Sequence, residues 1–105
     1  MALTTPIVEN VNSFDATLPT ELKFKVLGAT DQIVKNEIKI INNTTSEVVY
    51  NHTEYTLLYE QEIPANTLAN GVYYSVQFRV YNANDEHSNW SLFLKTIVQN
   101  GLSFI

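Results

Sequence analysis

A ten-residue run of β-branched and aromatic side chains constrains the fold of this chain more than any other feature. Residues 72–81 read Val-Tyr-Tyr-Ser-Val-Gln-Phe-Arg-Val-Tyr, with an apolar side chain at every second position. This period of two gives the segment one apolar and one amphipathic face, which is typical of a half-buried strand. Asn70 and Gly71 precede it and favour a turn, because both residue types tolerate positive φ. A strand of this length needs neighbours on both edges and a second sheet over its apolar face.

Shorter segments of the same character surround this strand. Residues 22–26 and 37–41 alternate apolar with charged side chains, as half-buried strands do, and turn-prone Gly, Asn, Asp and Pro residues separate the segments. No part of the chain shows the 3.6-residue period of an amphipathic helix. The predicted strands cover residues 5–14, 21–27, 33–41, 46–51, 54–63, 72–82 and 90–98, and residues 99–105 form an apolar exit segment.

This succession of short strands predicts the fold class. Strands separated by turn signals indicate an all-β fold, a seven-stranded antiparallel β-sandwich of immunoglobulin size. A small β-barrel is the structural alternative. A chain of 105 residues can bury one core, so residues 1–105 are expected to form a single domain.

The charge composition argues against several classes of partner. Six basic and eleven acidic residues give a formal net charge of −5, and the basic residues are scattered. Nucleic acid and anionic membrane surfaces bind clustered Lys and Arg, so neither is an expected partner. The absence of cysteine excludes a disulfide framework and a cysteine nucleophile or metal ligand. Since the start lacks a signal-peptide pattern and no apolar run could span a bilayer, ordinary export and membrane insertion are not expected.

Residues for acid–base or metal chemistry are few. His52 and His87 lie in polar, turn-like contexts and are expected at the surface. Asp85, His87 and Ser88 occur together, but neighbours in one loop seldom point at one another as a catalytic triad requires. The oxygen donors of residues 82–86 are of the type that Ca²⁺ prefers, although their spacing matches no calcium loop. The sequence therefore predicts no enzyme, no metal site and no cofactor.

Aromatic residues are the strongest candidates for contact with a partner, because they provide contact area at little cost in entropy. The alternative is that they decorate the outside of a sheet or pack in the core. The candidate aromatic face comprises Tyr50, Tyr55, Tyr59, Tyr73, Tyr81 and Trp90. The residues selected as partner contacts are Tyr73, Arg79, Tyr81, Trp90 and Phe104.

The entry to the long strand resembles the fibronectin type III family. In that family a leucine precedes a glycine by three positions and a tyrosine by six, and Leu68, Gly71 and Tyr74 have these spacings. Residues 88–91, Ser-Asn-Trp-Ser, look like the serine-rich region before the family's last strand. The chain departs from the family in lacking a tryptophan in its second strand and in having Asn70 where proline is common. The resemblance implies a structural corner, with Tyr74 buried and its hydroxyl bonded to backbone a few residues upstream.

The chain as a whole is similar to fibronectin-like and immunoglobulin-like modules of bacteriophage tail, neck and baseplate proteins. The similarity rests on residues 63–68 running into the tyrosine-rich strand and on residues 80–84 and 88–91. It implies a non-enzymatic structural protein of a virion, made in the bacterial host cytoplasm and placed in the tail, neck or collar, baseplate or capsid decoration. Its partners would be other virion proteins or copies of itself, with a cell-surface glycan as a weaker candidate. The alternative is an accessory carbohydrate-binding or spacer module of a secreted bacterial enzyme or adhesin.

Overall fold

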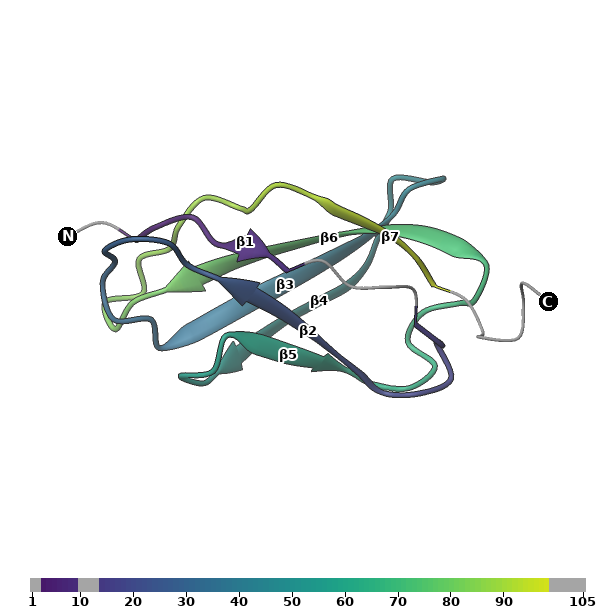
Figure 1. Cartoon of the computed structure of the whole chain (residues 1–105), viewed down its shortest axis with the longest axis horizontal. Coiled ribbons are helices and arrows are strands. Elements are labelled where there is room, and N and C mark those ends of the chain that lie inside the picture. The colour runs from purple at the N-terminus through teal and green to yellow at the C-terminus, as the bar shows by residue number, and fades with distance from the viewer. Residues whose placement is uncertain (1–2, 10–13, 99–105) are drawn as a thin grey trace.

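The computed structural model describes residues 3–9 and 14–98, and all regular structure within these ranges is β-strand. The strands form two antiparallel sheets, in the orders β1-β2-β5 and β4-β3-β6-β7 (Figure 1). No helix in the described part of the chain is long and apolar enough to cross a membrane. The strand bounds are β1 Ile7–Val8, β2 Thr20–Lys25, β3 Lys35–Asn42, β4 Val48–Tyr55, β5 Glu60–Ile63, β6 Val72–Tyr81 and β7 Leu94–Val98.

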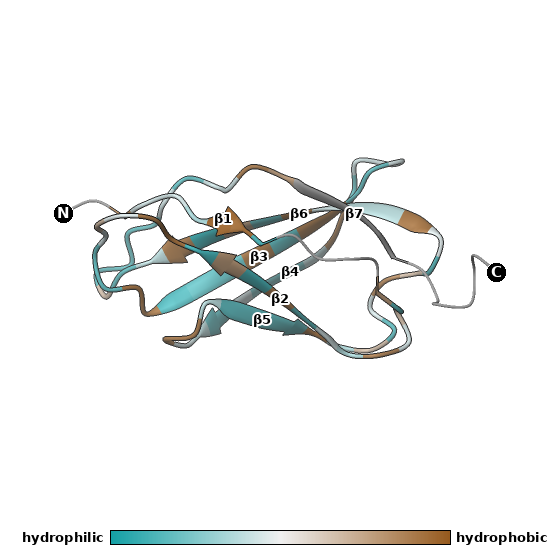
Figure 2. Cartoon of the chain, in the orientation of Figure 1, coloured by the Kyte–Doolittle hydropathy of each residue, from teal (hydrophilic) through white to brown (hydrophobic). Residues whose placement is uncertain are grey.

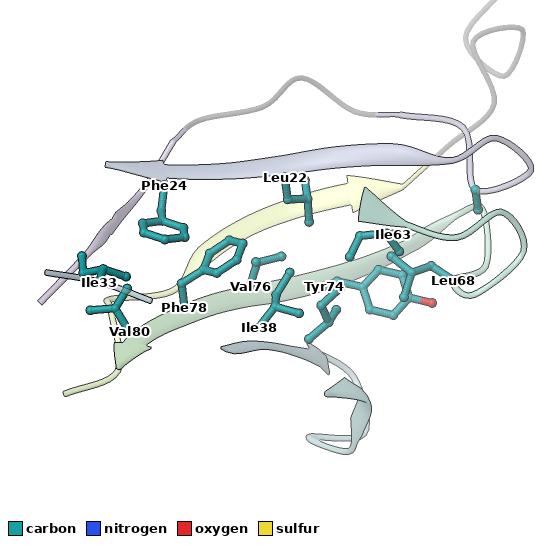
Figure 3. Close-up of a cluster of buried hydrophobic side chains, with 12 residues drawn as sticks. Leu22, Phe24, Ile33, Ile38, Ile63, Leu68, Tyr74, Val76, Phe78 and Val80 are labelled. Carbon is teal, nitrogen blue, oxygen red and sulfur yellow. The ribbon is translucent and has the colours of Figure 1, made fainter. Parts of the chain in front are cut away.

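The long strand identified in the sequence is β6, and it lies inside its sheet with β3 on one edge and β7 on the other. Its inner face carries the predicted apolar residues, all buried: Tyr74, Val76, Phe78 and Val80. The three-stranded sheet covers this face (Figure 3). The apolar positions that alternate along β6 are therefore buried, as predicted from the sequence.

Phe24 on β2 occupies the part of the core for which the second strand offers no tryptophan. Its ring centroid lies 4.7 Å from that of Phe78 and 5.2 Å from that of Tyr59. Leu22, two residues earlier on the same face, is also fully buried (Figure 3). Aromatic pairs at these separations add to the stabilisation from area burial. Phe24 thus links the two sheets through Phe78.

The prediction of an all-β fold with two antiparallel sheets is confirmed, whereas the prediction of seven full strands holds only in part. Six strands have four or more residues, and the first is reduced to the two-residue β1. Of the predicted first strand, residues 10–13 lie outside the described residues. The predicted exit segment 99–105 also lies outside them.

The predicted strand boundary near residues 52–53 is wrong. The fourth strand continues to Tyr55, because β3 supplies a register partner for each of its last residues up to the pair of Lys35 with Tyr55. The predicted strand over residues 54–63 is therefore split between the end of β4, a turn and the short β5. Two hydrogen bonds hold the turn: the Leu58 N–H donates to Thr56 Oγ1 at 3.0 Å, and Asn36 Nδ2 donates to the Leu58 carbonyl at 3.2 Å.

Candidate functional site

The entry corner of β6 has the geometry that the Leu68, Gly71 and Tyr74 spacing implies. The Tyr74 ring is buried beside Leu68, and its hydroxyl accepts a hydrogen bond from the Ala69 N–H at 3.0 Å (Figure 3). Gly71 has a φ of 86°, in the left-handed region that favours glycine. The hydrogen bond predicted from the Tyr74 hydroxyl to backbone upstream is present, five residues back in the chain.

Asn70, which stands where the family often has proline, ties this corner to a distant loop. Its Oδ1 accepts a hydrogen bond from the Ala16 N–H at 2.9 Å, and its Nδ2 donates to Asp15 Oδ1 at 3.1 Å. Proline has no side-chain amide that could make either bond. The departure from the family pattern therefore brings a specific long-range contact.

Glu37 organises the outer face of the four-stranded sheet. Its Oε1 accepts hydrogen bonds from Arg79 Nε and from the Tyr81 hydroxyl, each at 2.7 Å, and its Oε2 accepts one from Asn51 Nδ2 at 2.9 Å. Glu37 is buried, and the side chain of Arg79 is mostly covered. The donors come from β4 and β6, on either side of β3, so this carboxylate joins three strands on their outer face.

The protonation of this group follows from its partners. Burial acts to raise the pKa of the Glu37 carboxyl, but the hydrogen bonds from Asn51, Tyr81 and Arg79 outweigh it and hold that pKa below its ordinary value. Burial and the bond to Glu37 both raise the pKa of the Tyr81 hydroxyl. Burial acts to lower the pKa of Arg79, and the Glu37 carboxylate more than reverses this effect. The group is thus an ion pair with two neutral hydrogen-bond donors.

Trp90 has two cationic side chains close to its ring, and one of them, Arg79, is also bonded to Glu37. Lys39 Nζ is 4.3 Å from the indole centroid, and the Arg79 guanidinium carbon is 4.5 Å from it. Both separations are within the range of cation–π attraction. The outer-face residues Glu37, Lys39, Asn51, Arg79, Tyr81 and Trp90 are called the Glu37 network from here on.

A second ion pair extends this arrangement toward the loop after β6. Lys35 Nζ lies 2.5 Å from Asp85 Oδ1 and 4.5 Å from the Tyr81 ring centroid. The hydrogen bond between them lowers the pKa of Asp85 and raises that of Lys35. The loop itself is folded around Asn82, whose Oδ1 accepts the N–H groups of Asn84 and Glu86 at 3.0 and 3.1 Å. The side-chain oxygen of Asn82 is therefore already bonded within the loop.

Two serine hydroxyls attach the segment that carries Trp90 to β6. Ser88 Oγ accepts the Val80 N–H at 3.2 Å, and Ser91 Oγ accepts the Phe78 N–H at 3.0 Å. The backbone N–H groups of the same serines donate to the Val80 and Phe78 carbonyls, each at 2.9 Å. The prediction that the last strand begins at Trp90 is wrong: regular pairing begins at Leu94, because hydroxyls replace backbone acceptors before it.

The structure brings together three of the five predicted partner contacts. Arg79, Tyr81 and Trp90 meet in the Glu37 network, whereas Tyr73 lies near the opposite end of β6. Phe104 lies outside the described residues. Glu37 was not predicted from the sequence, because a charged residue that alternates with apolar ones in a strand is expected to face solvent. The sequence also does not show which residue of β6 lies opposite it, and this residue is Arg79.

The described residues contain no group of three or more His, Asp or Glu side chains that could hold a metal ion. His52 Nε2 lies 2.8 Å from Glu54 Oε2, and His87 Nδ1 lies 2.8 Å from the Ser88 carbonyl oxygen. Both histidines are exposed, as expected from the sequence. The main feature of the outer face is thus the Glu37 network.

No protein-family model and no curated protein sequence matches this chain. Among solved structures, one described as a myokine structure aligns with a TM-score of 0.76 at 14% sequence identity. The alignment covers 94% of this chain and 100% of the other. Together with the two antiparallel sheets, this similarity supports a fibronectin-like β-sandwich, and at this identity it shows the fold alone.

Proposed function

We propose that this chain is a non-enzymatic structural module of a bacteriophage virion and acts by assembly with copies of itself or with other virion proteins. The finer assignment, a fibronectin type III module of a tail, neck, baseplate or capsid decoration protein, is part of this proposal. It is supported by the resemblance of residues 63–68, 80–84 and 88–91 to such modules and by the Leu68, Gly71 and Tyr74 corner.

Exposed apolar side chains are the observation that carries the assembly proposal. Two stretches of neighbouring residues leave large apolar groups in water: Tyr55, at 79% exposure, is followed by Leu57 and Leu58, and Leu92, at 90%, by Phe93 at 60%. Single exposed apolar residues are common on protein surfaces, but adjacent ones are a recognised mark of interaction sites. Burial in a subunit contact would remove this area from water.

Sedimentation of the purified chain over a range of concentrations tests the proposal. We expect self-association that the double variant Leu92→Ser with Phe93→Ser abolishes, because it removes two exposed apolar groups without touching the described core. The matched control is Leu18→Ser with Leu27→Ser, which replaces exposed leucines at separated positions. If the chain stayed a monodisperse monomer at every concentration, or if the control variant lost self-association to the same extent, assembly through Leu92 and Phe93 would be contradicted.

Binding to a glycan array distinguishes the alternative carbohydrate-binding module. The observation that favours this alternative is Trp90, a half-buried aromatic ring on the outer face with Lys39 and Arg79 close to it. Specific glycan binding by a monomer, lost in Trp90→Ala without unfolding, would replace the assembly proposal. We expect no such binding, because Lys39 and Arg79 already contact the indole ring on which a sugar would stack.

A further inference from the structure

The unequal size of the two sheets leaves a cleft at one side of the sandwich. Four strands lie opposite three, and β4 and β5 are edge strands of their sheets (Figure 1). Tyr50, His52 and Glu54 on β4 pair with the inward-facing Ile40, Ile38 and Asn36 of β3, so they share the inner face of their sheet. His52 and Glu54 remain exposed because β5 does not cover them, whereas Tyr50 is half-buried against the core.

The cleft has a volume of about 410 Å³, within the usual range for ligand pockets. We call it the acidic cleft. Its lining residues are Glu21, Tyr50, His52, Glu54, Thr56, Leu58, Glu60, Gln61, Glu62 and Pro64.

The charge of this lining is one-sided. Four of its residues are glutamates, and none is Lys or Arg. The side chains of β5 are hydrophilic along most of its length (Figure 2). Glu21 and Glu62 are direct partners across β2 and β5, a like-charge arrangement that destabilises an antiparallel pair. Glu60 is opposite Lys23, so this carboxylate has a cationic neighbour across the sheet.

Gln61 supplies a second, independent observation. It lines the cleft at only 4% exposure, and its Nε2 donates to the Asn36 carbonyl, to Asn36 Oδ1 and to the His52 carbonyl at 3.2, 2.8 and 3.0 Å. Its Oε1 is buried and accepts no hydrogen bond in the described structure. A buried acceptor without a donor is costly, so a donor that entered the cleft and reached it would be stabilised.

From these features we propose that the acidic cleft binds a cationic side chain, Lys or Arg, presented by a partner protein. The carboxylates favour a positive charge and accept charge-assisted hydrogen bonds from its N–H groups, and a donor that extends inward past β5 to Gln61 Oε1 would satisfy that buried acceptor as well. Tyr50, Leu58 and Pro64 supply apolar surface for the methylene groups of such a side chain. A bare metal ion fits less well, because the described residues contain no cluster of metal-ligating side chains.

This site shares Leu58 with one of the two exposed apolar stretches but is separate from the Leu92 and Phe93 segment on which the assembly test is made, so it goes beyond the assembly proposal and can fail without it. Self-association can persist while the cleft binds nothing, and the cleft can bind a cation in a chain that stays monomeric. The two proposals are therefore measured by different variants and different readouts.

A titration followed by amide NMR tests the site. The probe is a hexa-arginine peptide amide, and the matched probe is hexa-citrulline, which keeps the shape but lacks the charge and has a carbonyl oxygen in place of one guanidinium nitrogen. We expect arginine-dependent shift changes at the amides of Glu54, Leu58, Gln61 and Glu62, weakened by added salt. Glu21→Gln with Glu62→Gln should reduce the affinity at least about tenfold, since two charge-assisted contacts are lost.

The control variant, Glu9→Gln with Glu47→Gln, changes the net charge equally at exposed positions outside the cleft and should retain the affinity. If this control variant lost as much affinity for the hexa-arginine peptide, binding would depend only on the net charge of the chain, and the proposed site would be wrong. Equal binding of citrulline, or no shifts at the named amides, would also overturn it. The same shifts on adding CaCl₂ alone, with displacement of the peptide, would identify a metal site in its place.

Discussion

Two regions of this molecule contain carboxylates in opposite circumstances. In the Glu37 network, one buried carboxylate receives three hydrogen bonds from Arg79, Tyr81 and Asn51, so its charge is balanced inside the chain. In the acidic cleft, four glutamates line one space without a Lys or Arg among the lining residues. The comparison suggests that the network serves the fold, whereas the cleft is suited to a charge from outside. Arg79 and Tyr81 are therefore less available to a partner than their place in the sequence indicates.

The largest effect should come from removing the carboxylate of the network. Glu37→Ala leaves the mostly covered Arg79 guanidinium and the Tyr81 hydroxyl without their acceptor, and we expect a loss of about 3 kcal/mol of unfolding free energy. Urea denaturation measures the loss. The matched change in the cleft, Glu62→Ala, should alter stability by less than about 0.5 kcal/mol. Equal losses in the two variants would remove the distinction between the regions.

The next largest effect should come from the neutral hydrogen bond between Tyr74 and Ala69, whose contribution to stability can be compared with that of the charged bonds to Glu37. Tyr74→Phe removes the acceptor of the Ala69 N–H at the β6 corner, and we expect a cost of about 1–3 kcal/mol, toward the lower end if water reaches that amide. Thermal or urea unfolding measures it, with Tyr55→Phe at an exposed ring as the control. No loss for Tyr74→Phe would show that the corner bond contributes little to stability.

A smaller effect is expected from pH. Because the pKa of Glu37 is lowered in the folded state, its contribution is fully present above the ordinary value of 4.5 and is lost as the pH falls through the folded-state pKa. The protonated carboxyl can still accept hydrogen bonds, so the loss should be less than in Glu37→Ala. The stability difference between wild type and Glu37→Gln should narrow at acidic pH. If the stability difference between wild type and Glu37→Gln stayed constant from neutral pH to well below pH 4.5, the lowered pKa of Glu37 would be contradicted.

The smallest effect should come from the like-charge pair in the cleft. Glu62→Lys places a positive charge opposite Glu21 and should stabilise the chain by roughly 0.2–1 kcal/mol, since it replaces repulsion between cross-strand neighbours with attraction. The same variant should weaken binding of the hexa-arginine peptide, because it puts a cation into the cleft. Stabilisation without any loss of peptide binding would mean that Glu21 and Glu62 are not part of the binding site.

Much of the inner face could be predicted from local pattern. Leu22 and Phe24 on β2, and Val76 and Phe78 on β6, were expected to point inward and are buried, because the side-chain period of a strand is a local property. The site was less predictable. Arg79, Tyr81 and Trp90 were selected from the sequence for their chemistry, but their common partner Glu37 was not, since it belongs to a distant strand.

The sequence by itself determined the all-β class and the apolar faces of β2 and β6, although not the bounds of every strand, and it marked the corner at Leu68, Gly71 and Tyr74 by spacing alone. These properties depend on residues a few positions apart. Only the tertiary structure decided the register that brings Glu37 opposite Arg79, and the layering of four strands on three that opens the acidic cleft beside β5. Both depend on contacts between strands far apart in the chain, which no local pattern encodes.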